Sequence, residues 1–203
     1  LMGENGAGKS TLGKILAGIY SADEGEVFIG GSKSSFKSPR DARLAGIGMV
    51  YQELSFCENL SVAENLCLGD TPKIGPFILR EKMNEKAAKA LKMIECDLDV
   101  TSTVASLPLG QQQLVQIAGA VAGGASILIF DEPTSSLSKV ESQRLMDLIR
   151  NLKAKGVTCI YVSHRLEEIF EICDDVTVLR DGQYVGTRPV KDISRDAMIQ
   201  MMV

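Results

Sequence analysis

The spacing of hydrophobic positions is clearest in the last third of the chain. Residues 127–130 form an unbroken apolar run, and residues 157–162 are apolar apart from Thr158. Runs of this kind are typical of strands buried on both faces of a parallel sheet. Between them, leucine and isoleucine recur at helical spacing over residues 139–155. The alternation of strand and helix predicts an α/β fold built on a parallel sheet.

Capping patterns predict where several helices begin. Ser61 with Glu64, and Ser138 with Glu141, each form the Ser-x-x-Glu capping box, so helices are expected from residues 62 and 139. Proline suits a first helical turn, so Ser38-Pro39 predicts a third, short helix. The other predicted elements are strands over 27–29 and 47–51, helices over 80–95, 114–122 and 166–170, a loop over 72–76 and a hairpin over 176–185.

Composition excludes several classes of protein. Of the 203 residues, 45% are hydrophobic and 24% are charged, which are ordinary values for a packed domain. Lys and Arg number 22 and Asp and Glu 26, and this net charge of −4 argues against a protein whose main partner is nucleic acid. No apolar run approaches the roughly 18 residues of a membrane span. The five cysteines form no CxxC pair, which disfavours zinc and disulfide frameworks.

A glycine-rich segment near the start matches the phosphate-loop pattern G-x-x-x-x-G-K-[ST]. Glycines allow backbone N–H groups to wrap a phosphate chain, which a Cβ atom would crowd. Lys9 is then expected against the β- and γ-phosphates, Ser10 on Mg²⁺, and Thr11 at the start of a helix whose positive end faces the anion. A chance glycine-rich turn is the alternative. The residues of the segment are Gly3, Glu4, Asn5, Gly6, Ala7, Gly8, Lys9, Ser10 and Thr11.

Two carboxylates, Asp131 and Glu132, follow the apolar run at 127–130. In phosphate-loop ATPases the first such carboxylate helps to hold Mg²⁺, which places Glu132 near a water that attacks the γ-phosphate. His164, the only histidine, follows the next strand in the same way. Ends of parallel strands share one rim of a sheet, where ligands bind. A solvated acidic pair and a surface histidine are the alternatives.

The ordered set of motifs resembles the ATP-binding cassette (ABC) ATPases. A finer resemblance, to the ATP-binding subunits of bacterial monosaccharide importers, rests on residues 3–11, 50–54, 110–113, 162–168 and 196–203. Those subunits carry two cassettes in one polypeptide, and this chain resembles the first. The family's motifs occur here, in the family's order, as the phosphate loop, Gln52, the signature segment Leu107, Pro108, Leu109, Gly110 and Gln111, the strand with Asp131 and Glu132, the segment Ser135, Ser136, Leu137 and Ser138, and His164.

The resemblance implies a phosphate-loop (RecA-like) core formed by residues 1–52 and 113–203. It also implies an inserted helical subdomain over residues 53–112. The first strands of the core are expected to be missing, as in a fragment of a longer two-cassette polypeptide. The strand that precedes the phosphate loop is expected beside residues 127–130.

The resemblance also implies a mechanism with ATP and Mg²⁺ as cofactors. Ser10, Gln52 and Asp131 are expected at the metal, with Glu132 as general base and His164 at the γ-phosphate. Two cassettes are expected to close head to tail, so that the segment 107–111 acts on the nucleotide of the other cassette. Residues 135–138 are expected to line the seam, which is the contact surface between the two cassettes.

The partners implied by the resemblance are a second cassette, membrane permease subunits and, indirectly, an external sugar-binding protein. Nucleic acid is not expected as a partner. The location implied is cytoplasmic, peripheral on the inner face of the cell membrane.

One departure from the family pattern concerns the signature, which usually has serine where this chain has Pro108. Proline is acceptable at a helix start but cannot donate the hydroxyl hydrogen bond to the γ-phosphate. A binding-only regulatory cassette is therefore one alternative. A phosphate-loop NTPase of another class and a cassette acting on ribosomes or DNA are the others.

Overall fold

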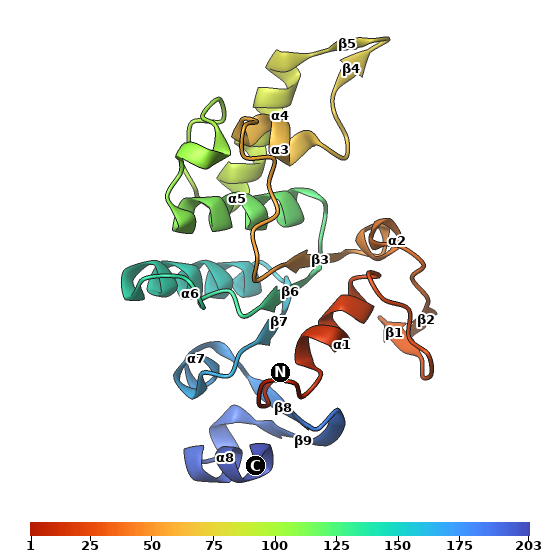
Figure 1. The fold of residues 1–203 in the computed structure, drawn as a ribbon, viewed down its shortest axis with the longest axis vertical. Helices are drawn as coiled ribbons and strands as arrows, with labels where there is room; N and C mark the ends of the chain where they lie inside the picture. The colour runs from red at the N-terminus through yellow and green to blue at the C-terminus, as the bar shows by residue number, and fades with distance from the viewer.

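The computed structural model describes residues 1–203 and contains a three-stranded parallel sheet in the order β3 (Ile47–Val50), β6 (Ile127–Asp131) and β7 (Thr158–Val162). Figure 1 shows this sheet at the middle of an elongated molecule. The register pairs Val50 with Phe130 and Asp131 with Val162, so the carboxyl ends of the three strands lie together. The predicted α/β fold with a parallel sheet is confirmed.

The apolar run of β6 is explained by burial on both faces of the sheet. Leu128 and Phe130 belong to the larger hydrophobic cluster, which also contains buried residues of α5 (Leu109–Ala122) and α6 (Lys139–Ala154). Ile129 points to the opposite face and joins a smaller cluster with Met49 and Ala17. Side chains alternate between the faces of a strand, so a strand covered on both sides must be apolar throughout.

Leu1 and Met2 lie between β7 and β8 (Asp175–Arg180). The Met2 N–H donates to the Thr177 carbonyl and the Leu179 N–H donates to the Met2 carbonyl, both at 2.8 Å. On the other side, the terminal amine of Leu1 donates to the Tyr161 carbonyl at 2.6 Å. The expectation that the backbone before the phosphate loop lies beside residues 127–130 is therefore wrong. Both edges of β6 are already hydrogen-bonded, to β3 and β7.

Three helices form the end of the molecule drawn at the top of Figure 1. α3 (Val62–Cys67) and α5 both contact α4 (Arg80–Met93). The segment predicted as a loop over 72–76 instead contains a small hairpin, β4 (Lys73–Ile74) and β5 (Phe77–Ile78). Gly75 and Pro76 supply its turn, which is why the sequence showed only turn signals there.

The predicted helix starts are confirmed for most elements. In both α3 and α6 the capping box forms in full, with the serine and glutamate each accepting a backbone N–H. Ser38 caps α2 (Pro39–Leu44) as expected. The helix after the phosphate loop, α1 (Lys9–Leu16), begins earlier than Thr11. The remaining elements are β1 (Val27–Ile29), β2 (Ser32–Ser34), η1 (Val104–Ser106), α7 (Leu166–Ile172), β9 (Gln183–Pro189), η2 (Val190–Asp192) and α8 (Arg195–Met202).

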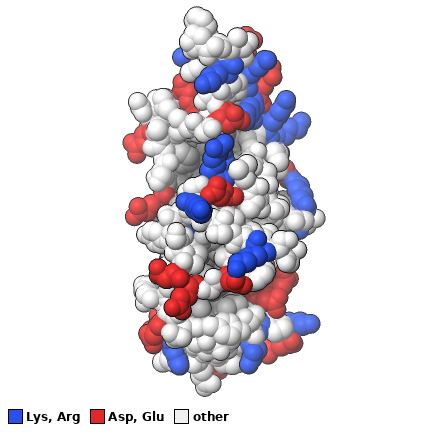
Figure 2. Space-filling view, turned by 90° about the vertical axis from the view of Figure 1, so that its right-hand side faces the viewer, with Lys and Arg blue, Asp and Glu red and all other residues white.

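The surface carries charges of both signs. Acidic and basic side chains are interspersed over the face shown in Figure 2, which agrees with the small net charge of −4. None of the helices combines the length and the apolar character that crossing a lipid bilayer requires.

Candidate nucleotide site

The phosphate loop joins the sheet region to α1 through a backbone that only glycine fits at two points. A Cβ atom on Gly3 would lie 2.2 Å from the Leu179 carbonyl oxygen, so the loop packs directly on β8. Gly8 is the residue before α1 and has a φ of 92°, in the left-handed region that side chains disfavour. No side chain caps α1. Its first N–H groups are therefore left for another acceptor, and the helix dipole favours an anion there.

The Lys9 ammonium lies inside this loop. The residue is only 5% exposed, and its Nζ donates to the carbonyl oxygens of Gly3 and Glu4 at 3.0 Å each. A buried cation held by two neutral carbonyls has no charged partner, and a phosphate oxygen would supply one. This arrangement fits the expectation for a polyphosphate ligand.

Ser10 and Asp131 meet across the site. The Ser10 hydroxyl on α1 donates to Asp131 Oδ1 at the end of β6, at 2.8 Å. Burial raises the pKa of the Asp131 carboxyl, while the Ser10 hydrogen bond opposes that rise. A hydroxyl and a carboxylate are hard oxygen donors of the kind that hold Mg²⁺ beside a bound phosphate. The residues present therefore fit a magnesium ion.

A cavity of about 330 Å³ joins the phosphate loop to residues from two other parts of the chain, Gln52 and Glu132. None of its lining residues is hydrophobic, which suits a charged ligand. Gln52 is an exposed residue just beyond β3, and Glu132 follows β6. The residues that line the cavity are Asn5, Gly6, Gly8, Lys9, Ser10, Thr11, Gln52 and Glu132.

Glu132 and His164 form a close pair at the rim of the sheet. His164 Nδ1 lies 3.1 Å from Glu132 Oε1, and the two side chains are 47% and 15% exposed. Glu132 has a φ of 45°, which is unusual for a residue with a side chain, and its N–H donates to the Val162 carbonyl at 3.0 Å. Such backbone strain clusters at functional sites. His164 touches Glu132 but does not line the 330 Å³ cavity.

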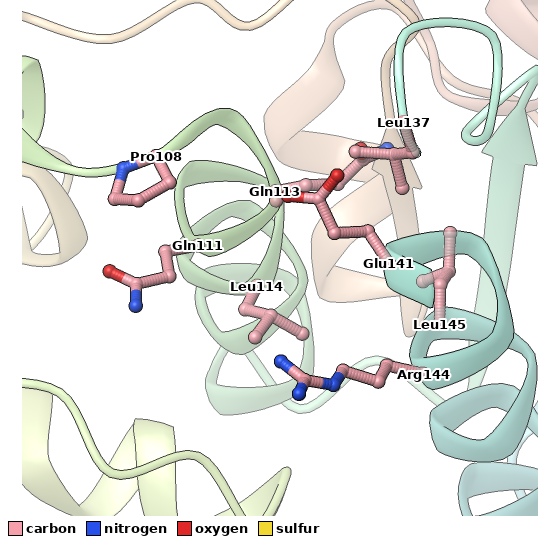
Figure 3. A pocket seen from close by; sticks show the side chains of 9 residues that line it. Pro108, Gln111, Gln113, Leu114, Leu137, Glu141, Arg144 and Leu145 are labelled. Atoms are coloured by element: carbon pink, nitrogen blue, oxygen red, sulfur yellow. The ribbon is translucent and has the colours of Figure 1, made fainter. Parts of the chain in front are cut away.

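Three residues of the signature segment, Pro108, Gly110 and Gln111, and one of the expected seam segment, Leu137, line a second cavity of about 230 Å³ between the starts of α5 and α6. Figure 3 shows Pro108 and Gln111 on the α5 side and Leu137 beside α6. This cavity shares no lining residue with the 330 Å³ cavity. The two cavities thus separate Lys9, Ser10, Gln52 and Glu132 from Pro108, Gly110, Gln111 and Leu137, whereas Leu107, Leu109, Asp131, Ser135, Ser136, Ser138 and His164 line neither.

Glu141 lines this second cavity and contacts α5. The sequence did not predict this contact. Figure 3 shows its side chain extending from α6 toward α5. A Cβ atom on Gly110 would lie 2.5 Å from Glu141 Oε1. Hydrogen bonds from Ser138, and a weaker one from the Gly110 N–H, lower the pKa of Glu141. The capping box predicted the contact with Ser138, but nothing local in the sequence signals the contact with Gly110.

Comparison with solved structures shows the same fold. The chain superposes on a nucleotide-free ATP-binding cassette from an ABC transporter with a TM-score of 0.84, at 26% identity, covering 100% of this chain and 86% of the other. It also superposes on the ADP conformation of the cassette MJ1267 with a TM-score of 0.81, at 26% identity, covering 98% and 85%.

Curated relatives match the whole chain. It is 47% identical to a ribose import ATP-binding protein RbsA of Clostridium perfringens, covering 100% of this chain and 41% of the relative. It is 48% identical to a xylose import ATP-binding protein XylG of Moorella thermoacetica, over 100% and 41%. The chain thus spans about two fifths of these relatives' length. A family model described as ABC transporter matches residues 1–135. With this match and the shared fold, the chain belongs to the ABC transporter family and is an ABC-type ATPase domain.

Proposed function

We propose that this chain binds and hydrolyses MgATP and thereby energises the import of a sugar. The observation that carries the proposal is the polar cavity of about 330 Å³ that joins the phosphate loop, Gln52 and Glu132. It combines a helix start without a side-chain cap, a buried lysine and a carboxylate at a strand end, which are the parts that phosphoryl transfer requires.

The proposed roles follow from the positions of the side chains. The loop N–H groups and Lys9 bind the β- and γ-phosphates and neutralise their charge. Ser10, Asp131 and Gln52 hold Mg²⁺, which supplies charge neutralisation at the phosphate oxygens when bound. Glu132 accepts a proton from the attacking water, and His164 orients the Glu132 carboxylate and reaches toward the γ-phosphate.

The domain division belongs to the same proposal. We assign residues 1–52 and 113–203 to the nucleotide-binding core and 53–112 to a helical subdomain. α5 begins in the helical subdomain and ends in the core, four residues before β6, so it connects the signature segment to the core. A movement of the helical subdomain would carry Pro108 and Gly110 with it.

The substrate and the partners are inferred from the relatives, which are named for ribose, xylose and galactose import. We infer that this cassette works with a second cassette, with membrane permease subunits and, indirectly, with an external sugar-binding protein. The working position is then at the inner face of the cell membrane, without nucleic acid.

A second candidate function is a cassette whose signature supports nucleotide binding but little turnover at the other site. Two observations favour it: Pro108 offers no hydroxyl, and the Gly110 N–H already faces the Glu141 carboxylate. Pro108→Ser, which supplies the hydroxyl, separates this candidate from an active signature, because only a signature limited by the missing hydroxyl gains ATPase turnover from the change.

Reconstitution tests the transport proposal. The polypeptide that carries this chain, placed with its permease and its external sugar-binding protein in proteoliposomes, is expected to drive uptake of ribose, xylose or galactose only when MgATP is supplied. The nonhydrolysable analogue AMP-PNP is the control and should support no accumulation. ATP hydrolysis without uptake of any of these sugars would contradict the transport role while leaving the ATPase assignment intact.

A further inference from the structure

A buried carboxylate that the mechanism above does not use lies behind the pair of Glu132 and His164. Glu168, on α7, is 8% exposed. Its Oε1 accepts the Thr134 hydroxyl at 2.6 Å, and its Oε2 accepts the hydroxyls of Tyr161 at 2.9 Å and Ser163 at 2.8 Å. The Arg165 guanidinium lies 3.4 Å from Oε1. Both oxygens are therefore fully engaged, which is what makes a buried carboxylate tolerable.

Three of the four partners of Glu168 come from the two turns that carry the pair. Thr134 lies on the turn just after Glu132, while Ser163 and Arg165 flank His164 directly. The Ser163 hydroxyl also accepts the Arg165 N–H at 2.9 Å, which closes the turn around the histidine. One carboxylate thus links the turn after β6 to the turn after β7.

We propose that Glu168 is a positioning residue that holds Glu132 and His164 in register for the hydrolytic step. The inference rests on the proposed function. Glu168 does not line the nucleotide cavity, so it acts through its two turns. The positive φ of Glu132 strengthens the case, because a strained backbone persists only where its surroundings hold it in place.

Two donors to the same oxygen provide a matched pair of variants. Ser163 and Tyr161 each donate one hydroxyl to Glu168 Oε2. Ser163 belongs to the turn beside His164, whereas Tyr161 lies within β7, where its backbone pairs with Phe130. Ser163→Ala and Tyr161→Phe each remove one hydroxyl from the same carboxylate oxygen, but Ser163→Ala also removes the acceptor of the Arg165 N–H. Thr134→Val removes only the hydroxyl that the turn after Glu132 donates to Oε1, so its comparison with Tyr161→Phe isolates the link through Glu168.

Single-turnover ATP hydrolysis is the first readout, measured on the full polypeptide. Misplacing a reacting group by about 1 Å can cost roughly 100-fold. We expect Ser163→Ala and Thr134→Val to slow hydrolysis by about tenfold or more, and Tyr161→Phe by no more than about twofold. Glu168→Gln, which keeps one acceptor oxygen, should recover part of the rate lost in Glu168→Ala. MgATP affinity should stay unchanged in all of these variants, because the phosphate loop is untouched.

The imidazole NMR signal of His164 is the second readout, and it needs no turnover. His164 is the only histidine of this chain, and the loss of its signal in His164→Gln assigns it in the full polypeptide. Ser163→Ala and Glu168→Gln should shift this signal, whereas Tyr161→Phe should leave it in place.

The positioning role would be overturned if Thr134→Val slowed hydrolysis no more than Tyr161→Phe and if Glu168→Gln shifted the His164 signal no more than Tyr161→Phe. Glu168 would then contribute to stability alone. A wild-type polypeptide that does not hydrolyse MgATP would refute the proposed function. In that case the His164 signal alone tests the role of Glu168. A shift in Glu168→Gln but not in Tyr161→Phe supports the positioning role, and equal shifts overturn it.

Discussion

Two helices of this chain begin beside motifs expected to bind phosphate, and neither start has a side-chain cap. α1 begins after Gly8 and α5 begins after Pro108. By contrast, α2, α3, α6 and α8 each begin with a serine whose side chain accepts a backbone N–H. A helix with its own cap has fewer free donors for a ligand. Four helices, α1, α4, α5 and α7, begin without a side-chain cap and leave donors available, and of these α1 and α5 begin beside the phosphate motifs.

The starts of α1 and α5 differ in what lies in front of them. Before α1 there is a polar cavity with the buried ammonium of Lys9 and the hydroxyl of Ser10. Before α5 there is a carboxylate, Glu141, that this chain itself supplies. The start of α1 together with the polar cavity in front of it, here called the α1 site, is therefore equipped by its own chain to receive an anion. The α5 start lacks a hydroxyl donor at Pro108, and in the proposed head-to-tail arrangement the phosphate in front of it would belong to the nucleotide of the second cassette.

The largest expected effect concerns chemistry at the α1 site. Glu132→Gln removes the proposed general base, and a positioned base contributes roughly 10²–10⁴ in rate. Single-turnover hydrolysis at this site should slow by that factor, while calorimetry should show unchanged MgATP affinity because the phosphate loop remains. An unaffected single-turnover rate would mean that Glu132 is not the base.

The next effect concerns binding at the same site. Charge-assisted hydrogen bonds are worth about 1.5–3 kcal/mol each, so Lys9→Ala should weaken MgATP binding by about tenfold or more. Lys14→Ala is the matched control: it removes a lysine from the same helix, outside the cavity lining, and should change affinity by less than about twofold. Equal affinities of wild type and Lys9→Ala would contradict the phosphate-loop assignment.

A smaller effect concerns the stability of the folded protein, which the buried Asp131 carboxylate at the α1 site lowers at neutral pH. The pKa of Asp131 is raised, so its neutral form is favoured in the folded protein. The stability linked to that protonation is present at acid pH and is lost as the pH rises through the raised folded value. At neutral pH, Asp131→Asn should therefore raise the melting temperature by a few degrees and remove the Mg²⁺ dependence of ATP binding. A lower melting temperature in thermal unfolding would contradict this sign.

The smallest effect tests the capped helices as a contrast. Ser61→Ala removes the cap of α3 and should lower the free energy of unfolding by about 1 kcal/mol. MgATP affinity should not change, because Ser61 lies outside both cavities. Denaturant unfolding and calorimetry on the same variant check both statements, and a loss of affinity would show that the two regions are coupled.

Much of the fold was predictable because its signals are local. The apolar run of β6 and the capping boxes at Ser61 and Ser138 identified elements whose bounds the structure closely reproduces. The hairpin around Gly75 was not predicted, because its two-residue strands are too short to show alternation.

The remaining contacts join residues far apart in the chain. Met2 pairs with β8, Glu141 meets Gly110, and Glu168 meets Thr134. No local spacing predicts such contacts. The candidate site could be predicted residue by residue from its motifs, whereas the groups that support it required the folded structure.

The central claim is that the α1 site binds this cassette's own nucleotide, whereas the start of α5 acts on the nucleotide bound by the second cassette. Restoring the missing hydroxyl by Pro108→Ser tests it directly, in the polypeptide that carries both cassettes. One hydrogen bond to a charged oxygen is worth about 1.5–3 kcal/mol, so steady-state ATPase turnover should rise by up to about 10- to 100-fold. The gain should survive Lys9→Ala and vanish when the phosphate-loop lysine of the second cassette is replaced. No gain from serine, or a gain that disappears with Lys9, would contradict the claim.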